Sequence, residues 1–207
     1  MQYDASSGAI SRARVILLIG PSGSGKDSLI DAAREPLRAY GVEVARRVIT
    51  RSAEAKGEDA YGVSEAQFQA MREAGAFALD WQANGWCYGI PIQIDSWLDA
   101  GKSVLINGSR GHLAAARRRY PDLLAVGLAV SPGVLRERLL ARGRESLQDI
   151  EQRLARNTSL QAYDADVHVL DNSATLAQAL RALLCLLGEQ GVIRSSLAKK
   201  PTCNLPD

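Results

Sequence analysis

The stretch GPSGSGKDSL, residues 20–29, constrains the fold of this chain more than any other segment, because it directly follows the apolar run VILLI. Five consecutive apolar residues predict a buried β-strand, and the glycines after it allow a loop whose main-chain N–H groups turn toward an anion. A helix starting near Lys26 adds positive potential, and the lysine ammonium reaches the β- and γ-phosphates of a nucleotide. An ordinary glycine-rich turn is the alternative. The pattern therefore predicts an ATP-binding loop made of Gly20, Pro21, Ser22, Gly23, Ser24, Gly25, Lys26, Asp27 and Ser28.

One residue of this loop departs from the usual pattern G-x-x-x-x-G-K-[ST]. Asp27 stands where a hydroxyl normally binds Mg²⁺, and Ser28 follows it. A carboxylate beside phosphates is repelled unless a cation lies between them, and Mg²⁺ prefers oxygen ligands. The segment SVLING, residues 103–108, brings the neutral Asn107 to the strand end that commonly carries an acidic metal partner. We predict that Asp27, with Ser28, forms the metal site; the alternative is that Asp27 only stabilises the first turn of the helix.

Apolar segments alternate with helical ones along the rest of the chain. This alternation predicts a single α/β domain with a parallel sheet covered by helices on both faces. The predicted strands are residues 15–20, 43–50, 103–108, 123–130 and 165–172, and the predicted helices are 27–39, 112–120, one from 132 and one ending at 187.

A smaller unit interrupts this alternation. Ser64 and Gln67 form a capping-box pattern that predicts a helix ending at Gly75. Residues 76–83 and 86–90 flank Asn84-Gly85, a dipeptide that favours a tight β-hairpin. We therefore expect an insertion over residues 46–92 and a polar tail over 189–207, with the core at 14–188.

Composition excludes several functional classes. The chain has 207 residues, of which 46% are hydrophobic, and a formal net charge of +2, so nothing in its charge favours nucleic acid or a membrane surface. Its three cysteines and two histidines match no zinc pattern. The start shows no signal-peptide core and no run reaches the about 18 apolar residues of a membrane span, so we expect a cytoplasmic enzyme.

The order of motifs over residues 14–188 resembles that of guanylate kinases. The resemblance rests on VITRS (48–52), FALDWQANGWCYGI (77–90) and RERLLARGRE (136–145). Guanylate kinases carry a glutamate that recognises guanine where this chain has Leu79, and Glu54 replaces the second arginine of an R-x-x-R motif. The loop aspartate and the tetrad NGSR (107–110) resemble a narrower family, the ribose 1,5-bisphosphate phosphokinases of phosphonate breakdown. That resemblance implies transfer of the γ-phosphoryl group of ATP, with Mg²⁺, to the 1-phosphate of ribose 1,5-bisphosphate, giving 5-phosphoribosyl 1-diphosphate.

The resemblance and the residue chemistry together assign roles to individual side chains. Guanidinium groups suit phosphates because they form paired charge-assisted hydrogen bonds. Acceptor-binding residues are predicted to be Arg51, Tyr88, Arg110 and Arg47. As alternatives, Arg47 would simply lie along a strand edge, Tyr88 would serve packing and Arg110 would cap a loop. The resemblance also implies an arginine-rich lid over residues 138–156 that excludes water, and catalysis is assigned to Lys26 and to Arg138 and Arg142 of this lid. The rival functions are a nucleoside monophosphate kinase and a non-catalytic binding module, and a homodimer remains open.

Overall fold

The computed structural model describes residues 13–50, 59–143, 146–159 and 163–194. Within these ranges it does not describe the side chains of Arg142, Arg153 and residues 156–159. The elements are β1 (Val15–Ile19), α1 (Lys26–Ala39), β2 (Glu43–Val44), β3 (Val48–Ile49), β4 (Tyr61–Gly62), α2 (Glu65–Glu73), β5 (Phe77–Ala83), β6 (Trp86–Pro91), α3 (Gln93–Asp99), β7 (Val104–Asn107), η1 (Arg110–His112), α4 (Leu113–Arg119), β8 (Leu124–Ala129), α5 (Pro132–Arg142), α6 (Leu147–Ser159), β9 (His168–Asp171) and α7 (Leu176–Glu189).

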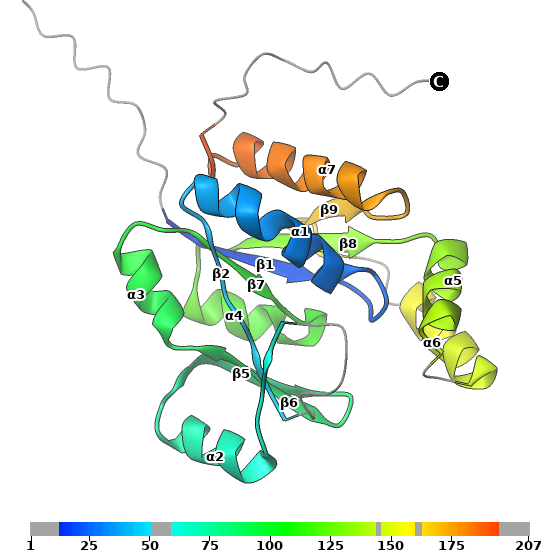
Figure 1. The fold of residues 1–207 in the computed structure, drawn as a ribbon, viewed down its shortest axis with the longest axis horizontal. Helices are drawn as coiled ribbons and strands as arrows, with labels where there is room; N and C mark the ends of the chain where they lie inside the picture. Colours follow the sequence, from blue (N-terminus) through cyan, green and yellow to red (C-terminus); the bar gives the residue numbers. More distant parts are fainter. Residues whose placement is uncertain (1–12, 51–58, 144–145, 160–162, 195–207) are drawn as a thin grey trace, which may run out of the picture.

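The larger of two sheets contains five parallel strands in the order β2-β7-β1-β8-β9 (Figure 1). The central strand β1 is buried along its whole length, and Leu17 pairs with Ile106 on one side and Ala125 on the other. The predicted parallel sheet is confirmed. Parallel strands end at one edge of a sheet, so the loops after β1, β7, β8 and β9 meet there.

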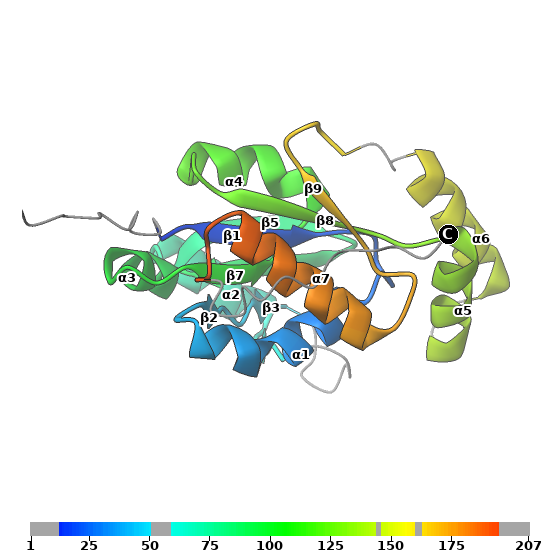
Figure 2. The ribbon, with the colours of Figure 1, turned by 90° about the horizontal axis from the view of Figure 1, so that it is seen from above.

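Helices cover both faces of this sheet, as the apolar strands predict. Ile16 and Leu18 pack in one cluster with Leu29 of α1 and Leu183 of α7. Leu17 and Ile19 point to the opposite face, whose cluster includes residues of α3 and α4. Figure 2 shows α4 and α7 on opposite sides of the strands. The sheet is therefore a middle layer between helices, and the loops at its carboxyl edge are left to form a site.

A second sheet, in the order β4-β3-β6-β5, packs below the first in Figure 1. Its β5–β6 hairpin turns at Asn84 and Gly85, with φ angles of 51° and 77°, which confirms the hairpin predicted from this dipeptide. The capping box of α2 is also present, because Ser64 and Gln67 exchange their hydrogen bonds. Leu79 and Ile90 of the hairpin join the cluster beneath the first sheet, so the insertion is anchored to the core.

The predicted strand over residues 43–50 is wrong in one respect, because it is two strands in different sheets. Glu43 and Val44 pair with β7, and the Ala45 N–H still donates to the Leu105 carbonyl. Val48 instead pairs with Gly89 of the second sheet. A run of β-branched residues indicates extended chain but not which sheet it joins. Helix α3 was not predicted, because this seven-residue helix has no side-chain N-cap that a sequence pattern would reveal.

Helices α5 and α6 form a small hairpin of their own beyond the end of β8 (Figure 1). Leu135 and Leu139 of α5 pack with Ile150 of α6 and with Val130 in a separate apolar cluster. This hairpin occupies the position predicted for the lid. Across the described ranges, no helix combines the length and the apolarity that crossing a membrane requires.

Candidate active site

The loop between β1 and α1 has the geometry of a phosphate cradle. Gly23 and Gly25 have φ angles of 91° and 86°, which glycine adopts without strain, and α1 begins directly after Gly25. The Lys26 ammonium folds back over the loop, where it donates to the carbonyls of Gly20 at 2.8 Å and Pro21 at 3.0 Å. The loop thus concentrates main-chain donors, a helix N-terminus and a cation in one place, which suits a polyphosphate.

Two distant segments hold the middle of this loop. The Ser24 carbonyl accepts a hydrogen bond from Asn172 Nδ2 at 2.6 Å and another from Arg138 Nη1 at 3.3 Å. Ser24 itself is fully buried, and its Oγ has no partner among the residues that the structure describes. Arg138, a predicted lid residue, therefore lies against the loop, while Asn172 fixes it from the end of β9.

Helix α5 also packs directly on the loop at Gly23. A Cβ at this position would lie 2.9 Å from both Leu135 Cδ1 and Leu139 Cδ2, closer than real Cβ contacts allow. Glycine is therefore required at residue 23 by close approach as well as by its φ angle. The first part of the predicted lid is thus docked on the phosphate loop.

Asp27 lies beside the end of β7, as the sequence suggested. Asn107 Nδ2 donates to Asp27 Oδ1 at 2.7 Å, and Asn107 is 4% exposed. Ser28 is exposed one residue further along α1, where the helix turns by about 100°. Mg²⁺ in kinases is commonly held by one or two carboxylates together with substrate phosphates. Asp27 supplies one such carboxylate; elsewhere, too, the described residues contain no cluster of three or more His, Cys, Asp or Glu.

Arg47 and Tyr88, both predicted to bind the acceptor, lie together where the two sheets meet. The Arg47 guanidinium is 4.9 Å from the centroid of the Tyr88 ring and 5.9 Å from that of Trp81, and the two rings stack at 5.5 Å. Its Nη1 donates to the Asn107 carbonyl at 3.3 Å. Arg47 is 8% exposed. Its contacts with the hairpin rings and with Asn107 connect the insertion to the end of β7.

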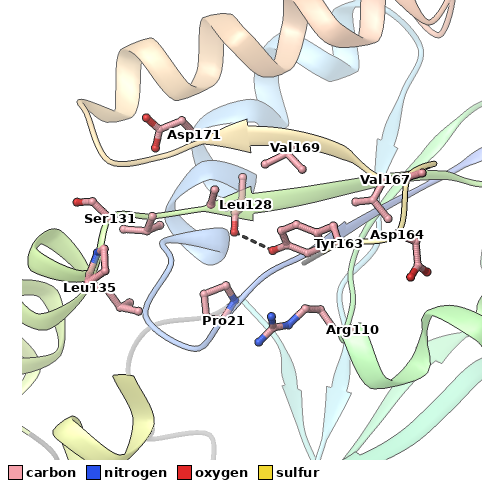
Figure 3. A pocket seen from close by; sticks show the side chains of 14 residues that line it. Pro21, Arg110, Leu128, Ser131, Leu135, Tyr163, Asp164, Val167, Val169 and Asp171 are labelled. Atoms are coloured by element: carbon pink, nitrogen blue, oxygen red, sulfur yellow. Dashed lines mark hydrogen bonds between the residues drawn. The ribbon is translucent and has the colours of Figure 1, made fainter. Parts of the chain in front are cut away.

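A cavity of about 550 Å³ opens at the carboxyl edge of the sheet beside the loop (Figure 3). Arg110 lies in its wall with Pro21 on one side and Tyr163 on the other, 6.0 Å from the Tyr163 ring centroid. The Tyr163 hydroxyl donates to the Leu128 carbonyl at 2.8 Å, and burial raises the pKa of this tyrosine. The cavity places one predicted acceptor-binding cation next to the phosphate loop. Its remaining lining residues are Ala129, Val130, Ser131, Pro132, Leu135, Asp164, Ala165, Val167, Val169 and Asp171.

His112 is a residue of this region that the sequence did not single out. It follows Arg110 in η1 and stacks on Trp81 with ring centroids 5.2 Å apart. Burial lowers its pKa, and nearby Asp80 only partly opposes this effect. Its Nε2 is buried without a partner in the described part of the chain. A single histidine without a neighbouring motif has no sequence pattern that would mark it as part of a site.

Two predicted residues cannot be placed. Arg51 lies outside the described residues, and so does the side chain of Arg142, although its backbone ends α5. The roles of these two residues, like those of the other predicted site residues, stay predictions.

Comparison with known proteins identifies the class to which this fold and loop belong. A family model described as guanylate kinase matches residues 12–189, and the chain belongs to this family. The crystal structure of guanylate kinase from Anaplasma phagocytophilum superposes with a TM-score of 0.61 and covers 87% of each chain. Its sequence identity is 22%, so this likeness concerns the fold.

Curated relatives define the particular family more narrowly. Proteins named ribose 1,5-bisphosphate phosphokinase PhnN are similar to this chain: the one from Pseudomonas paraeruginosa is 63% identical over 176 residues, and the one from Azotobacter vinelandii is 62% identical over 174. Each match covers 84% of this chain and 95% of the relative. A relative of the same name from Desulfomicrobium baculatum is 46% identical over 177 residues. The chain is a kinase of this ribose 1,5-bisphosphate phosphokinase family.

Proposed function

We propose that this protein transfers the γ-phosphoryl group of ATP to the 1-phosphate of ribose 1,5-bisphosphate, forming 5-phosphoribosyl 1-diphosphate and ADP. The identity of 63% over 84% of the chain with a relative of that name carries the proposal. The phosphate loop supports the donor half, because Lys26 and the N-terminus of α1 meet there.

The insertion supports an acceptor without a purine base. Leu79, at the position of the guanine-binding glutamate, is 6% exposed and packs in an apolar cluster. The neighbouring carboxylate, Asp80, accepts hydrogen bonds from Arg72 of α2, including one from Nε at 2.8 Å. A closed site that left the N–H donors of guanine unpaired would lose about 1–3 kcal/mol for each. These features argue against the rival guanylate kinase activity.

The residues of this chain act by positioning and by charge. The attacking group is a phosphate oxygen that is already anionic at neutral pH, so no strong general base is required. Lys26 and Arg138 lie at the loop, and Arg110 lies in the cavity wall beside it. Cations held around the transferring group stabilise the charge of its equatorial oxygens in the transition state. Arg51, Tyr88, Arg47 and Arg142 complete the proposed site, and α5 excludes water when ATP is present.

Asp27, with Ser28, is the proposed site for Mg²⁺. When bound, this ion neutralises phosphate charge. The chain's own contribution is the carboxylate that Asn107 holds at 2.7 Å.

Product identification tests the proposed function. Enzyme, ATP, Mg²⁺ and ribose 1,5-bisphosphate are incubated together, and phosphorus NMR should show the new diphosphate of 5-phosphoribosyl 1-diphosphate. Lys26→Met serves as the inactive control because it keeps the length of the side chain but removes its charge. Faster ADP formation with GMP than with the sugar bisphosphate would overturn the proposal.

A further inference from the structure

Asn107 occupies one of the most firmly fixed positions at the edge of the first sheet. It is the last residue of β7 and pairs with Leu18 of β1. The next N–H, that of Gly108, donates to the Leu18 carbonyl at 2.8 Å, and Arg47 donates to the Asn107 carbonyl at 3.3 Å. The side chain is 4% exposed, so burial and the bond to Asp27 leave its amide little freedom to move.

Only one end of this buried amide is used. Nδ2 donates to Asp27 Oδ1 at 2.7 Å, while Oδ1 is buried with no hydrogen-bond partner among the described residues. A buried acceptor without a partner is unfavourable, so an asparagine retained only for packing would be expected to satisfy both ends. The hydrogen bond to the Asp27 carboxylate therefore explains why residue 107 is an asparagine.

We propose that Asn107 is a positioning residue that orients the Asp27 carboxylate toward the metal of bound ATP. The two residues then form a matched pair, with one carboxylate in the loop and one neutral donor at the strand end. A second carboxylate at residue 107 would face Asp27 in hydrogen-bond contact and repel it. This inference rests on the proposed function only through the metal-nucleotide complex and does not depend on the acceptor.

Calorimetry with a non-hydrolysable ATP analogue measures this role without catalysis. The metal coupling is defined as the dissociation constant without Mg²⁺ divided by that with Mg²⁺. We expect Asn107→Leu to lower this coupling by about tenfold or more, as loss of a residue that orients a metal ligand does, while metal-free affinity changes little. A purely structural amide would instead change both affinities together.

Exchanging the two side chains, Asp27 and Asn107, gives a more decisive test than a single substitution. Asp27→Asn leaves two amides and Asn107→Asp leaves two carboxylates, and each single variant should lose coupling. The double variant with both changes restores one carboxylate and one amide, so it should recover a large part of the coupling that Asp27→Asn loses. Electron paramagnetic resonance of Mn²⁺ with the same analogue provides a second readout of metal binding.

Asp31→Asn is the matched control, because Asp31 lies one helical turn after Asp27 on α1 and its exposed carboxylate is 3.8 Å from Arg34. Its coupling should equal that of the unchanged protein. Circular dichroism checks that each variant folds, and Asn107→Ser replaces Asn107→Leu if the latter does not. The inference is overturned if the folded residue 107 variant keeps full coupling, or if the double variant binds metal no better than Asp27→Asn. If ribose 1,5-bisphosphate proves not to be the acceptor while these couplings hold, the proposed function fails and this inference stands.

Discussion

The contacts of the buried Arg47 guanidinium include two aromatic rings and a carbonyl. Its guanidinium lies between the insertion and the first sheet, 4.9 Å from the Tyr88 ring centroid, and donates to the Asn107 carbonyl. A buried guanidinium held by rings and a carbonyl stabilises the contact between its neighbours, and truncation leaves a cavity together with an unpaired acceptor. Arg47 therefore contributes to stability whatever its role toward the acceptor.

We predict that Arg47→Met lowers the free energy of unfolding by about 1–3 kcal/mol, measured by urea denaturation. Arg136→Met is the matched control, since the Arg136 side chain is 49% exposed and pairs with Glu151 at 2.7 Å. Exposed ion pairs contribute less than about 1 kcal/mol, so the control should be milder. Equal and small effects would mean that Arg47 does not join the sheets.

His112 makes stability depend on pH. Burial lowers its pKa in the folded protein below the usual value of 6.5, so the unfolded chain binds more protons as the medium is acidified. The stabilisation that this neutral histidine allows is present above about pH 6.5 and is lost as the pH falls through the lowered pKa.

His112→Gln should therefore lose less stability than the unchanged protein between pH 7.5 and pH 5. Urea denaturation at both pH values gives the comparison. An identical loss of unfolding free energy in the two proteins would show that His112 does not titrate differently on folding.

Among the elements, α5 is the one whose contact with the loop has the most direct consequence for nucleotide binding. Gly23 has a φ angle of 91°, and a Cβ there would lie 2.9 Å from the side chains of Leu135 and Leu139. Gly23→Ala should lose about 1–2 kcal/mol from the backbone strain alone, with more from the clash, and should weaken binding of the ATP analogue.

Gly133→Ala is the control for this substitution because it lies at the start of α5 with no atom near its Cβ position. Alanine is favoured over glycine in helices by about 0.5–1 kcal/mol, so this variant should be neutral or stabilised. Thermal melting and calorimetry with the analogue check both. An undiminished affinity of Gly23→Ala would contradict docking of α5 on the loop.

At the scale of elements, sequence patterns correctly predicted the features that depend on a few neighbouring residues. Asn84-Gly85 and the Ser64 capping box were correct because turn type and helix start depend on a few neighbouring residues. The division of residues 43–50 between two sheets depends on partners far along the chain, Leu105 and Gly89, which no local pattern encodes. Helix α3 lacks a side-chain cap and was missed for that reason.

At the scale of the whole molecule, the described residues form two large apolar cores on opposite faces of the first sheet, besides the small cluster between α5 and α6. Leu183 lies fully buried in the cluster with α1 and α7, and Ile94 lies fully buried in the cluster with the insertion. Because β1 contributes side chains to both clusters, we expect them to unfold together.

Leu183→Ala and Ile94→Ala should each lower the free energy of unfolding by about 2–5 kcal/mol, and their effects should add because the clusters share no side chain. Urea denaturation followed by fluorescence and by circular dichroism should give coincident transitions for every variant. Separate transitions for the two probes would show that the second sheet unfolds alone.

The site was predictable to the extent that it depends on the loop motif. Lys26 and Asp27 were singled out from their spacing behind a strand, and their roles stay predictions. The contact of the Asp27 carboxylate with Asn107 was visible only in the structure. The burial of Arg47 was not predictable, since it requires the hairpin to fold back over β3. Asn172 and its contact with Ser24 join residues 148 positions apart, which only the assembled sheet reveals.

The second sheet is built by one unbroken stretch of chain, from Val48 in β3 to Pro91 in β6. Its coding sequence is consequently a single gene segment, with both ends at the border of the first sheet. Because the proposed acceptor-binding residues Arg51 and Tyr88 belong to this segment, we expect exchanges confined to it to change the preferred acceptor while the loop Gly20–Ser28 stays as it is.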